Sequence, residues 1–209
     1  MNRKLSKIAT IFATTVAMSP AYASEAVTLE TSVQPVFVNG KLQGCAFHFR
    51  SANSEVQYRN GELTIADGSL NFYAFEGKVP AFVLKIGIID PNKKTVTAPD
   101  TAYLINQLET NKSDLINSID AEAKGFRMFS YEANGKTVDI ITDASISGRL
   151  TIGYTLNGGQ MASLLPIDMT MKNLDLNNPD NSTIDTNAPR RWLECIIQNM
   201  KNQMEYFNK

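Results

Sequence analysis

The stretch that decides the fold is residues 146–172, ISGRLTIGYTLNGGQMASLLPIDMTMK. From Ile146 to Leu156, every second residue is apolar or glycine, and polar residues fill most of the positions between them. This period of two is typical of a strand with one buried face. Asn157-Gly158 follows, and this dipeptide tolerates the positive φ angles of a type I′ turn. We therefore predict a β-hairpin whose second strand runs from Gln160 to Lys172, with Pro166 at an edge or a bulge because proline has no N–H.

The same turn dipeptide recurs at Asn39-Gly40, Asn60-Gly61 and Asn134-Gly135, and each is predicted to be a hairpin tip. A further turn or bulge is expected at Asp67-Gly68. Apolar residues fill most positions from Phe82 to Ile89, as expected for a central strand covered on both faces. The other strands are predicted over Val27–Val38, Lys41–Ser51, Glu62–Phe75, Phe82–Asp90, Phe126–Ala133 and Lys136–Asp143.

Helical signals are confined to the middle and the end of the chain. Ser113 is a candidate N-cap for a short helix with Gly125 at its C′ position, and Thr101–Leu108 fits either a helix or a strand. Residues 174–189 are rich in Asn, Asp, Ser and Thr and are predicted to be a loop. Arg190–Phe207 is predicted to be an amphipathic helix, because large apolar residues recur at helical spacing: Trp192, Ile196, Met200, Met204 and Phe207.

The pattern as a whole predicts a mainly β protein. We expect a single antiparallel β sandwich or open barrel built from hairpins, with one C-terminal amphipathic α-helix packed on it. Residues 24–188 form the β-rich part, and residues 189–209 form a helix of the same domain. The apolar stripe of that helix is predicted to pack on the sheet, although a partner-binding face is the alternative.

The N-terminus carries the features of a secretory signal peptide. Arg3, Lys4 and Lys7 precede an uncharged apolar run from Ile8 to Met18, and Ala21-Tyr22-Ala23 is a typical cleavage motif. The apolar run is shorter than the ~20 residues of a membrane-spanning helix. We therefore predict that residues 1–23 are removed, that no transmembrane segment remains, and that the mature protein is periplasmic or secreted.

The chain has two cysteines, Cys45 and Cys195. In an exported protein an even number of cysteines favours a disulfide, with two separate buried thiols as the alternative. Cys45 shares a strand face with Phe47 and Phe49, and Cys195 lies at the edge of the apolar helix face. We therefore predict that a Cys45–Cys195 bridge ties the C-terminal helix to the second strand.

The sequence motifs predict no catalytic, cofactor-binding or metal-ligating residue, and no cofactor. The one histidine, His48, lies in the middle of a predicted strand, and neither a G-x-S-x-G elbow nor a phosphate-binding glycine loop occurs. Oxygen ligands cluster in the tail loop without the EF-hand glycine and glutamate: Asp175, Asn177, Asp180 and Asn181. Without its three basic signal residues the chain is net acidic, which disfavours nucleic-acid binding.

These features favour a non-enzymatic binding or interaction protein of the cell envelope or extracellular space, with a partner that the sequence does not identify. The alternative is an acid/base hydrolase of envelope or extracellular glycans or esters, which needs two carboxylates beside a cleft. Four aspartates lie on predicted strands or strand ends and are the candidates for that chemistry: Asp90, Asp139, Asp143 and Asp168.

Overall fold

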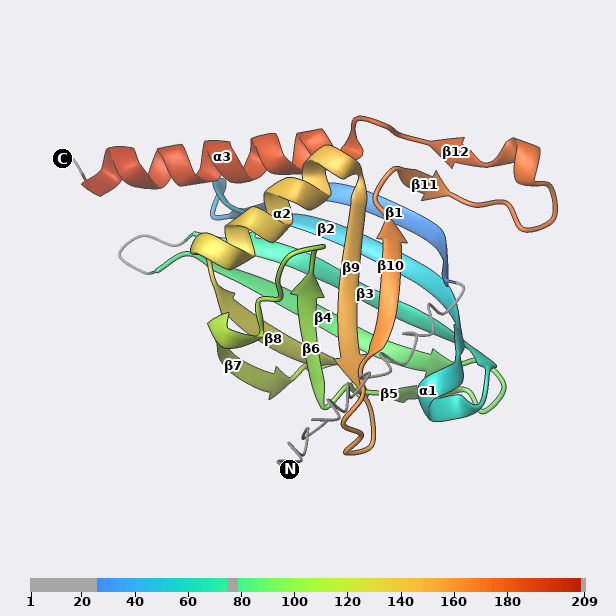
Figure 1. Cartoon of the computed structure of the whole chain (residues 1–209). Coiled ribbons are helices and arrows are strands. Elements are labelled where there is room, and N and C mark those ends of the chain that lie inside the picture. Colours follow the sequence, from blue (N-terminus) through green and yellow to red (C-terminus); the bar gives the residue numbers. More distant parts are fainter. Residues whose placement is uncertain (1–25, 75–78, 208–209) are drawn as a thin grey trace, which may run out of the picture.

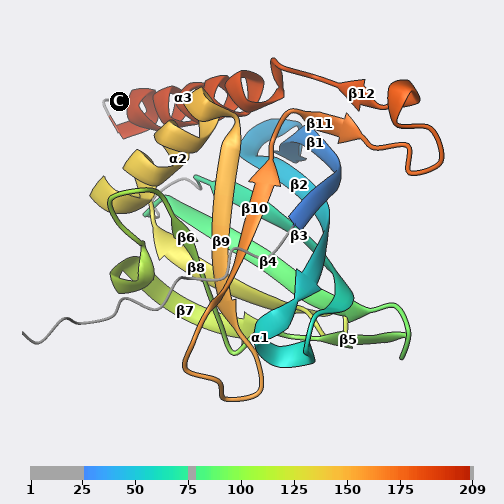
Figure 2. The ribbon, with the colours of Figure 1, turned by 45° about the vertical axis from the view of Figure 1, so that its right-hand side comes forward.

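The computed structural model describes residues 26–74 and 79–207. The predicted signal peptide, residues 1–23, lies outside the described residues. Two antiparallel sheets pack face to face, and two helices, α2 (Gly135–Ser147) and α3 (Ala188–Phe207), lie at one end of the sandwich (Figures 1 and 2). This architecture confirms the predicted fold class.

The larger sheet is an antiparallel meander whose central strands follow the chain order. In the described residues it has nine strands, in the order β12-β11-β1-β2-β3-β4-β8-β7, with β5 paired to β4. The strands are β1 (Ala26–Val38), β2 (Lys41–Glu55), β3 (Glu62–Tyr73), β4 (Ala81–Asp90), β5 (Thr95–Thr97), β7 (Leu115–Asp120), β8 (Arg127–Glu132), β11 (Met171–Asn173) and β12 (Thr183–Ile184).

The smaller sheet contains the predicted hairpin. Its order is β10-β9-β6, with β6 at Thr101–Ile105, β9 at Arg149–Thr155 and β10 at Ser163–Asp168. Asn157 and Gly158 form the predicted turn with φ angles of 54° and 71°, within a longer loop that joins β9 to β10. The second strand is shorter than the predicted Gln160–Lys172, because β10 ends at Asp168 and Met171 lies in β11 of the larger sheet. Pro166 lies on the edge strand β10, as predicted for a residue without an N–H.

Two of the other three predicted hairpin tips connect neighbouring strands. Asn39 and Gly40 join β1 to β2 with positive φ. Asn60 and Gly61 also have positive φ, but a four-residue helix, α1 (Val56–Arg59), precedes them between β2 and β3. The third prediction, at Asn134-Gly135, is wrong, because Asn134 is the N-cap of α2.

The core lies between the two sheets. Inward side chains of β2, β3 and β4 meet those of β6, β9 and β10, and the predicted strand faces are confirmed: Cys45, Phe47 and Phe49 are buried while His48 is exposed. The largest fully buried side chains are Trp192, Tyr131, Tyr154, Phe47, Phe49, Phe72, Phe82 and Phe129.

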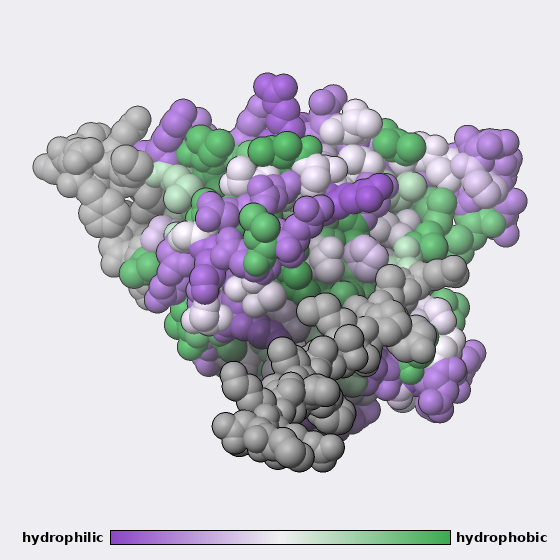
Figure 3. Space-filling model, in the orientation of Figure 1, coloured by the Kyte–Doolittle hydropathy of each residue, from purple (hydrophilic) through white to green (hydrophobic). Residues whose placement is uncertain are grey.

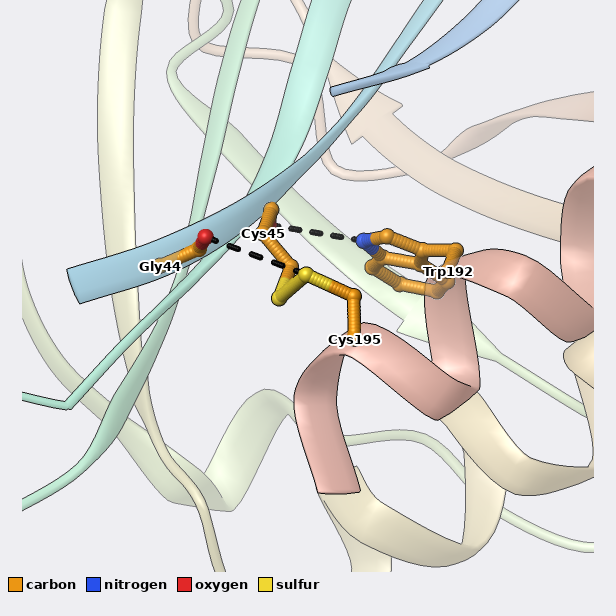
Figure 4. Close-up of a disulfide and its surroundings, with 4 residues drawn as sticks. All are labelled: Gly44, Cys45, Trp192 and Cys195. Atoms are coloured by element: carbon orange, nitrogen blue, oxygen red, sulfur yellow. Dashed lines mark hydrogen bonds between the residues drawn. A yellow bond between two sulfur atoms is a disulfide. The ribbon is translucent and has the colours of Figure 1, made fainter. Parts of the chain in front are cut away.

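Helix α3 is fixed to β2 by covalent and apolar contacts, as predicted (Figure 4). Cys45 and Cys195 form a disulfide with their Cα atoms 6.0 Å apart. Trp192 is fully buried, its indole N–H donates to the Cys45 carbonyl at 3.4 Å, and its ring centre lies 5.6 Å from that of Phe47. Within the described part of the chain, no helix has the length and apolar character needed to cross a membrane.

The largest difference between the predicted and the observed secondary structure lies in the segment before β9. Lys136–Asp143 was expected to be a strand, and it lies in α2 instead. The strand predicted from Ile146 begins only at Arg149, because Gly148 ends the helix with φ 70°. The β-branched residues that favour a strand here are overridden by packing, since Ile140, Ile141 and Ala144 bury one helical face.

Three smaller predictions also change. The helix expected after Ser113 is a single 3-10 turn at Lys112–Asp114 followed by strand β7, and Gly125 lies in a loop with φ 83°. The ambiguous segment 101–108 begins with strand β6. The turn expected at Asp67-Gly68 is absent, because β3 pairs with β2 and β4 there without a register shift.

Candidate functional site

A groove lined by described residues lies beside α2. The helix begins at Gly135 after Asn134, which adopts the extended backbone usual for an N-cap, and ends at Gly148 in the left-handed region. Ile140 and Ala144, one turn apart, are both buried toward the groove floor. Because the helix reverses directly into β9, its last turn stands beside Arg149 and Thr151 of that strand.

The opposite wall is the tight loop that follows β6. Asn106 Oδ1 accepts hydrogen bonds from the backbone N–H groups of Leu108 and Glu109, at 3.0 and 2.8 Å. Asn106 Nδ2 donates to Asp143 Oδ2 of α2 at 2.8 Å. One side chain therefore both shapes the loop and links it to the helix across the groove.

The groove between these walls has a volume of about 610 Å³. Small-ligand sites in proteins typically measure about 300–1,000 Å³. Leu108 and Ile146 stand at its rim with 91% and 78% of their surface exposed. Figure 3 shows this face of the molecule, where apolar side chains interrupt the polar surface over α2 and the strands beside it. The full lining is Ile105, Asn106, Gln107, Leu108, Ile140, Asp143, Ala144, Ile146, Ser147, Arg149 and Thr151.

A second hollow, of about 510 Å³, lies on the outer face of the larger sheet and includes His48. It is polar, and Arg50 bridges Glu30 of β1 and Asp67 of β3 across it, at 3.4 and 3.1 Å. His48 is paired in register with Ser32 and Ser69, and its imidazole has no hydrogen bond to a described residue. The nucleophile–base hydrogen bond that general-base catalysis needs is therefore not formed there.

The pKa of His48 lies below its usual value of 6.5. Partial burial is the largest cause, Asp67 opposes it, and Lys85 adds to it.

The four candidate aspartates do not meet at one cleft. Asp90 is buried and forms ion pairs with Arg59 and Lys93, and the Lys93 backbone N–H is the main cause of its lowered pKa. Asp139 and Asp143 lie on the helix α2 rather than on a strand. Of the four aspartates, only Asp143 lines the groove. Only Asp168 lines a third hollow, which lies beside β1.

The oxygen-rich tail loop forms turns. Asp175 Oδ1 accepts hydrogen bonds from the backbone N–H groups of Asn177 and Asn178, and a 3-10 turn covers Pro179–Asn181. Among the described residues, no group of three or more His, Cys, Asp or Glu side chains is arranged to hold a metal ion.

Sequence reasoning missed the groove, because its walls come from three segments that meet only when residues 135–147 are helical. The signal that could have revealed that helix is Gly148, a C-cap glycine four residues after the buried Ala144. No protein-family model, no curated protein and no solved structure matches this chain.

Proposed function

We infer that this chain is an exported, non-enzymatic binding protein of the cell envelope or extracellular space, and that it holds the apolar part of a ligand in the groove beside α2. The groove itself is the observation that carries this proposal. Exposed apolar side chains scattered singly need no explanation, but contiguous ones around a concave surface mark binding sites. The Asn106–Asp143 hydrogen bond supports the proposal further, because it preforms the site and so lowers the cost of binding.

The apolar probe N-phenyl-1-naphthylamine, which is uncharged and fluoresces in apolar surroundings, tests this function. We expect saturable binding by the mature protein. The double variant Leu108→Glu/Ile146→Glu removes apolar contact at the rim and should weaken binding roughly tenfold or more. Leu176→Glu is the matched control, because Leu176 is also exposed but lies between β11 and β12.

Saturable binding that only the double variant weakens supports the proposal. Absence of binding, or equal loss in the control, contradicts it. Export is tested separately by the intact mass of the protein from the periplasm or medium, which should begin at Ser24. A mass that retains residues 1–23 contradicts the signal-peptide prediction.

The hydrolase alternative is tested with a broad screen of ester and glycan substrates. We expect no turnover, and any activity found should survive His48→Gln, because His48 lies on the outer sheet face away from the groove. A loss of more than about a hundredfold in that variant, with the fold intact, would identify His48 as a general base.

A further inference from the structure

Arg149, at the end of the groove, has no anionic partner among the residues that the structure describes. The described residues include six arginines, and five of them form salt bridges: Arg50, Arg59, Arg127, Arg190 and Arg191. The Arg149 guanidinium has no hydrogen bond or ion pair with any described residue. Its five N–H donors therefore remain available in a planar fork that matches a carboxylate.

The positively charged residue Arg149 lies at the apolar groove. The residue lines the groove and also a neighbouring hollow of about 320 Å³ beside β1. Arg149 therefore lies where the apolar groove meets the neighbouring hollow, the place at which an anionic head group would leave the apolar surface.

Two carboxylates lie near Arg149, and both are engaged elsewhere. Asp143 accepts from Asn106, and Asp168, which is paired in register with Arg149, accepts from the backbone and side chain of Thr170 at 2.9 and 2.7 Å. Neither comes within 4.0 Å of the guanidinium. Their charges still disfavour a dianion such as a phosphate monoester, so a singly charged, planar carboxylate suits the site best.

The apolar lining indicates the rest of the ligand. Its apolar side chains are all aliphatic: Ile105, Leu108, Ile140, Ala144 and Ile146. Such a lining offers dispersion contacts to a flexible chain and no aromatic ring on which a planar ligand could stack.

We propose that the groove binds a free long-chain carboxylate, with the aliphatic chain along α2 and the carboxylate held by Arg149. This inference rests on the proposed function and adds the chemical class of the ligand. Asp143 then acts as a selectivity element, because its charge weakly opposes the anion while its hydrogen bond to Asn106 keeps the groove in shape.

Calorimetric titration of the mature protein with three probes tests the proposal: laurate, dodecan-1-ol and dodecylammonium, each below its aggregation concentration. We expect laurate to bind most tightly and dodecylammonium most weakly. Arg149→Gln should weaken laurate binding about tenfold or more, the effect of one lost hydrogen bond to a charged group, and leave dodecanol unchanged. Arg190→Gln, an exposed arginine on α3, is the matched control and should change neither affinity.

Asp143→Asn should tighten laurate binding, since an asparagine oxygen still accepts from Asn106 while the repulsive charge is gone. Equal affinity for laurate and dodecanol, or no effect of Arg149→Gln, overturns the carboxylate assignment. The proposed binding of apolar ligands in the groove is then still supported. Tightest binding of dodecylammonium overturns it in favour of Asp143 as the charged anchor. If none of the three probes binds, both this inference and the proposed function fail.

Discussion

Tyr154 of β9 donates its phenolic hydrogen to the carboxylate of Glu55 at the end of β2, and both side chains are buried between the two sheets. Glu55 Oε1 also accepts from Ser163 of β10 at 2.7 Å and from the backbone N–H groups of Gln57 and Tyr58. One carboxylate therefore joins the larger sheet to both strands of the hairpin and caps α1. Burying a carboxylate is costly unless its lone pairs are filled, and here four donors fill them.

We predict that Tyr154→Phe lowers the free energy of unfolding by about 1–3 kcal/mol, because Glu55 Oε2 is then buried without a donor. Tyr58→Phe, which removes a hydrogen bond to the Met161 carbonyl from a more exposed tyrosine, should cost less because water can replace that bond. Urea unfolding of both variants measures the difference. Equal losses in the two variants would show that the Glu55–Tyr154 contact adds no stability of its own.

The Cys45–Cys195 bridge closes a loop of 150 positions. In the chain-entropy model, a loop of this length stabilises the folded state by up to about 5 kcal/mol, and measured disulfides typically give 2–4. We predict that reduction lowers the urea midpoint of the mature protein. Non-reducing peptide mapping of the exported protein should recover the two cysteines in one linked fragment. Free thiols at both positions, or identical midpoints before and after reduction, would contradict the prediction.

Trp192 carries the packing of α3 on β2. Trp192→Ala removes a fully buried indole, and we expect a loss of roughly 3–5 kcal/mol in the free energy of unfolding. Ile197→Ala, at a half-exposed position of the same helix, is the control and should cost far less. Thermal unfolding provides the measurement. An unchanged midpoint would mean that the apolar stripe serves an interface rather than the core.

Short-range signals predicted most of the sandwich. Alternating polarity and turn dipeptides are local properties, so the central strands and the Asn39-Gly40 and Asn157-Gly158 turns could be identified from the sequence. Residues 135–147 were predicted wrongly, because their Thr and Ile residues favour strands and outweigh the helix-end signal of Gly148. Burial of one face, including Ile140 and Ala144, makes the helix preferable. The disulfide was predictable because each cysteine lay on a face whose burial the pattern defined.

The groove depends on that one misassigned segment. The sequence pattern predicts Arg149 to be an outward-facing residue within a long strand. In the structure, Gly148 adopts the left-handed conformation and ends α2, so Arg149 is the first residue of β9. Asn106 is a residue type that favours the turn it forms. Its hydrogen bond to Asp143 joins residues 37 positions apart, so no local sequence pattern predicts that bond. Sites assembled from separate segments in this way need the tertiary structure to be recognised.

His48 offers a direct test of the outer sheet face, because it is the single histidine of the chain. Its imidazole resonances should titrate with a midpoint below 6.5, since partial burial and Lys85 outweigh the opposing effect of Asp67. Lys85→Met should raise the midpoint, and Asp67→Asn should lower it further. A wild-type midpoint above 6.5 would mean that Asp67 dominates the field at this position.

The same shift makes stability depend on pH in a defined direction. Because the folded pKa of His48 is depressed, the unfolded chain binds a proton more readily than the folded one as the pH falls through 6.5. The contribution of His48 to stability is therefore complete above pH 6.5 and is lost as the pH falls toward the folded pKa. We predict that the wild type loses more thermal stability than His48→Gln between pH 7.5 and pH 5.5. Parallel losses would show that the imidazole has the same proton affinity in both states, and a larger loss in the variant would reverse the sign of the shift.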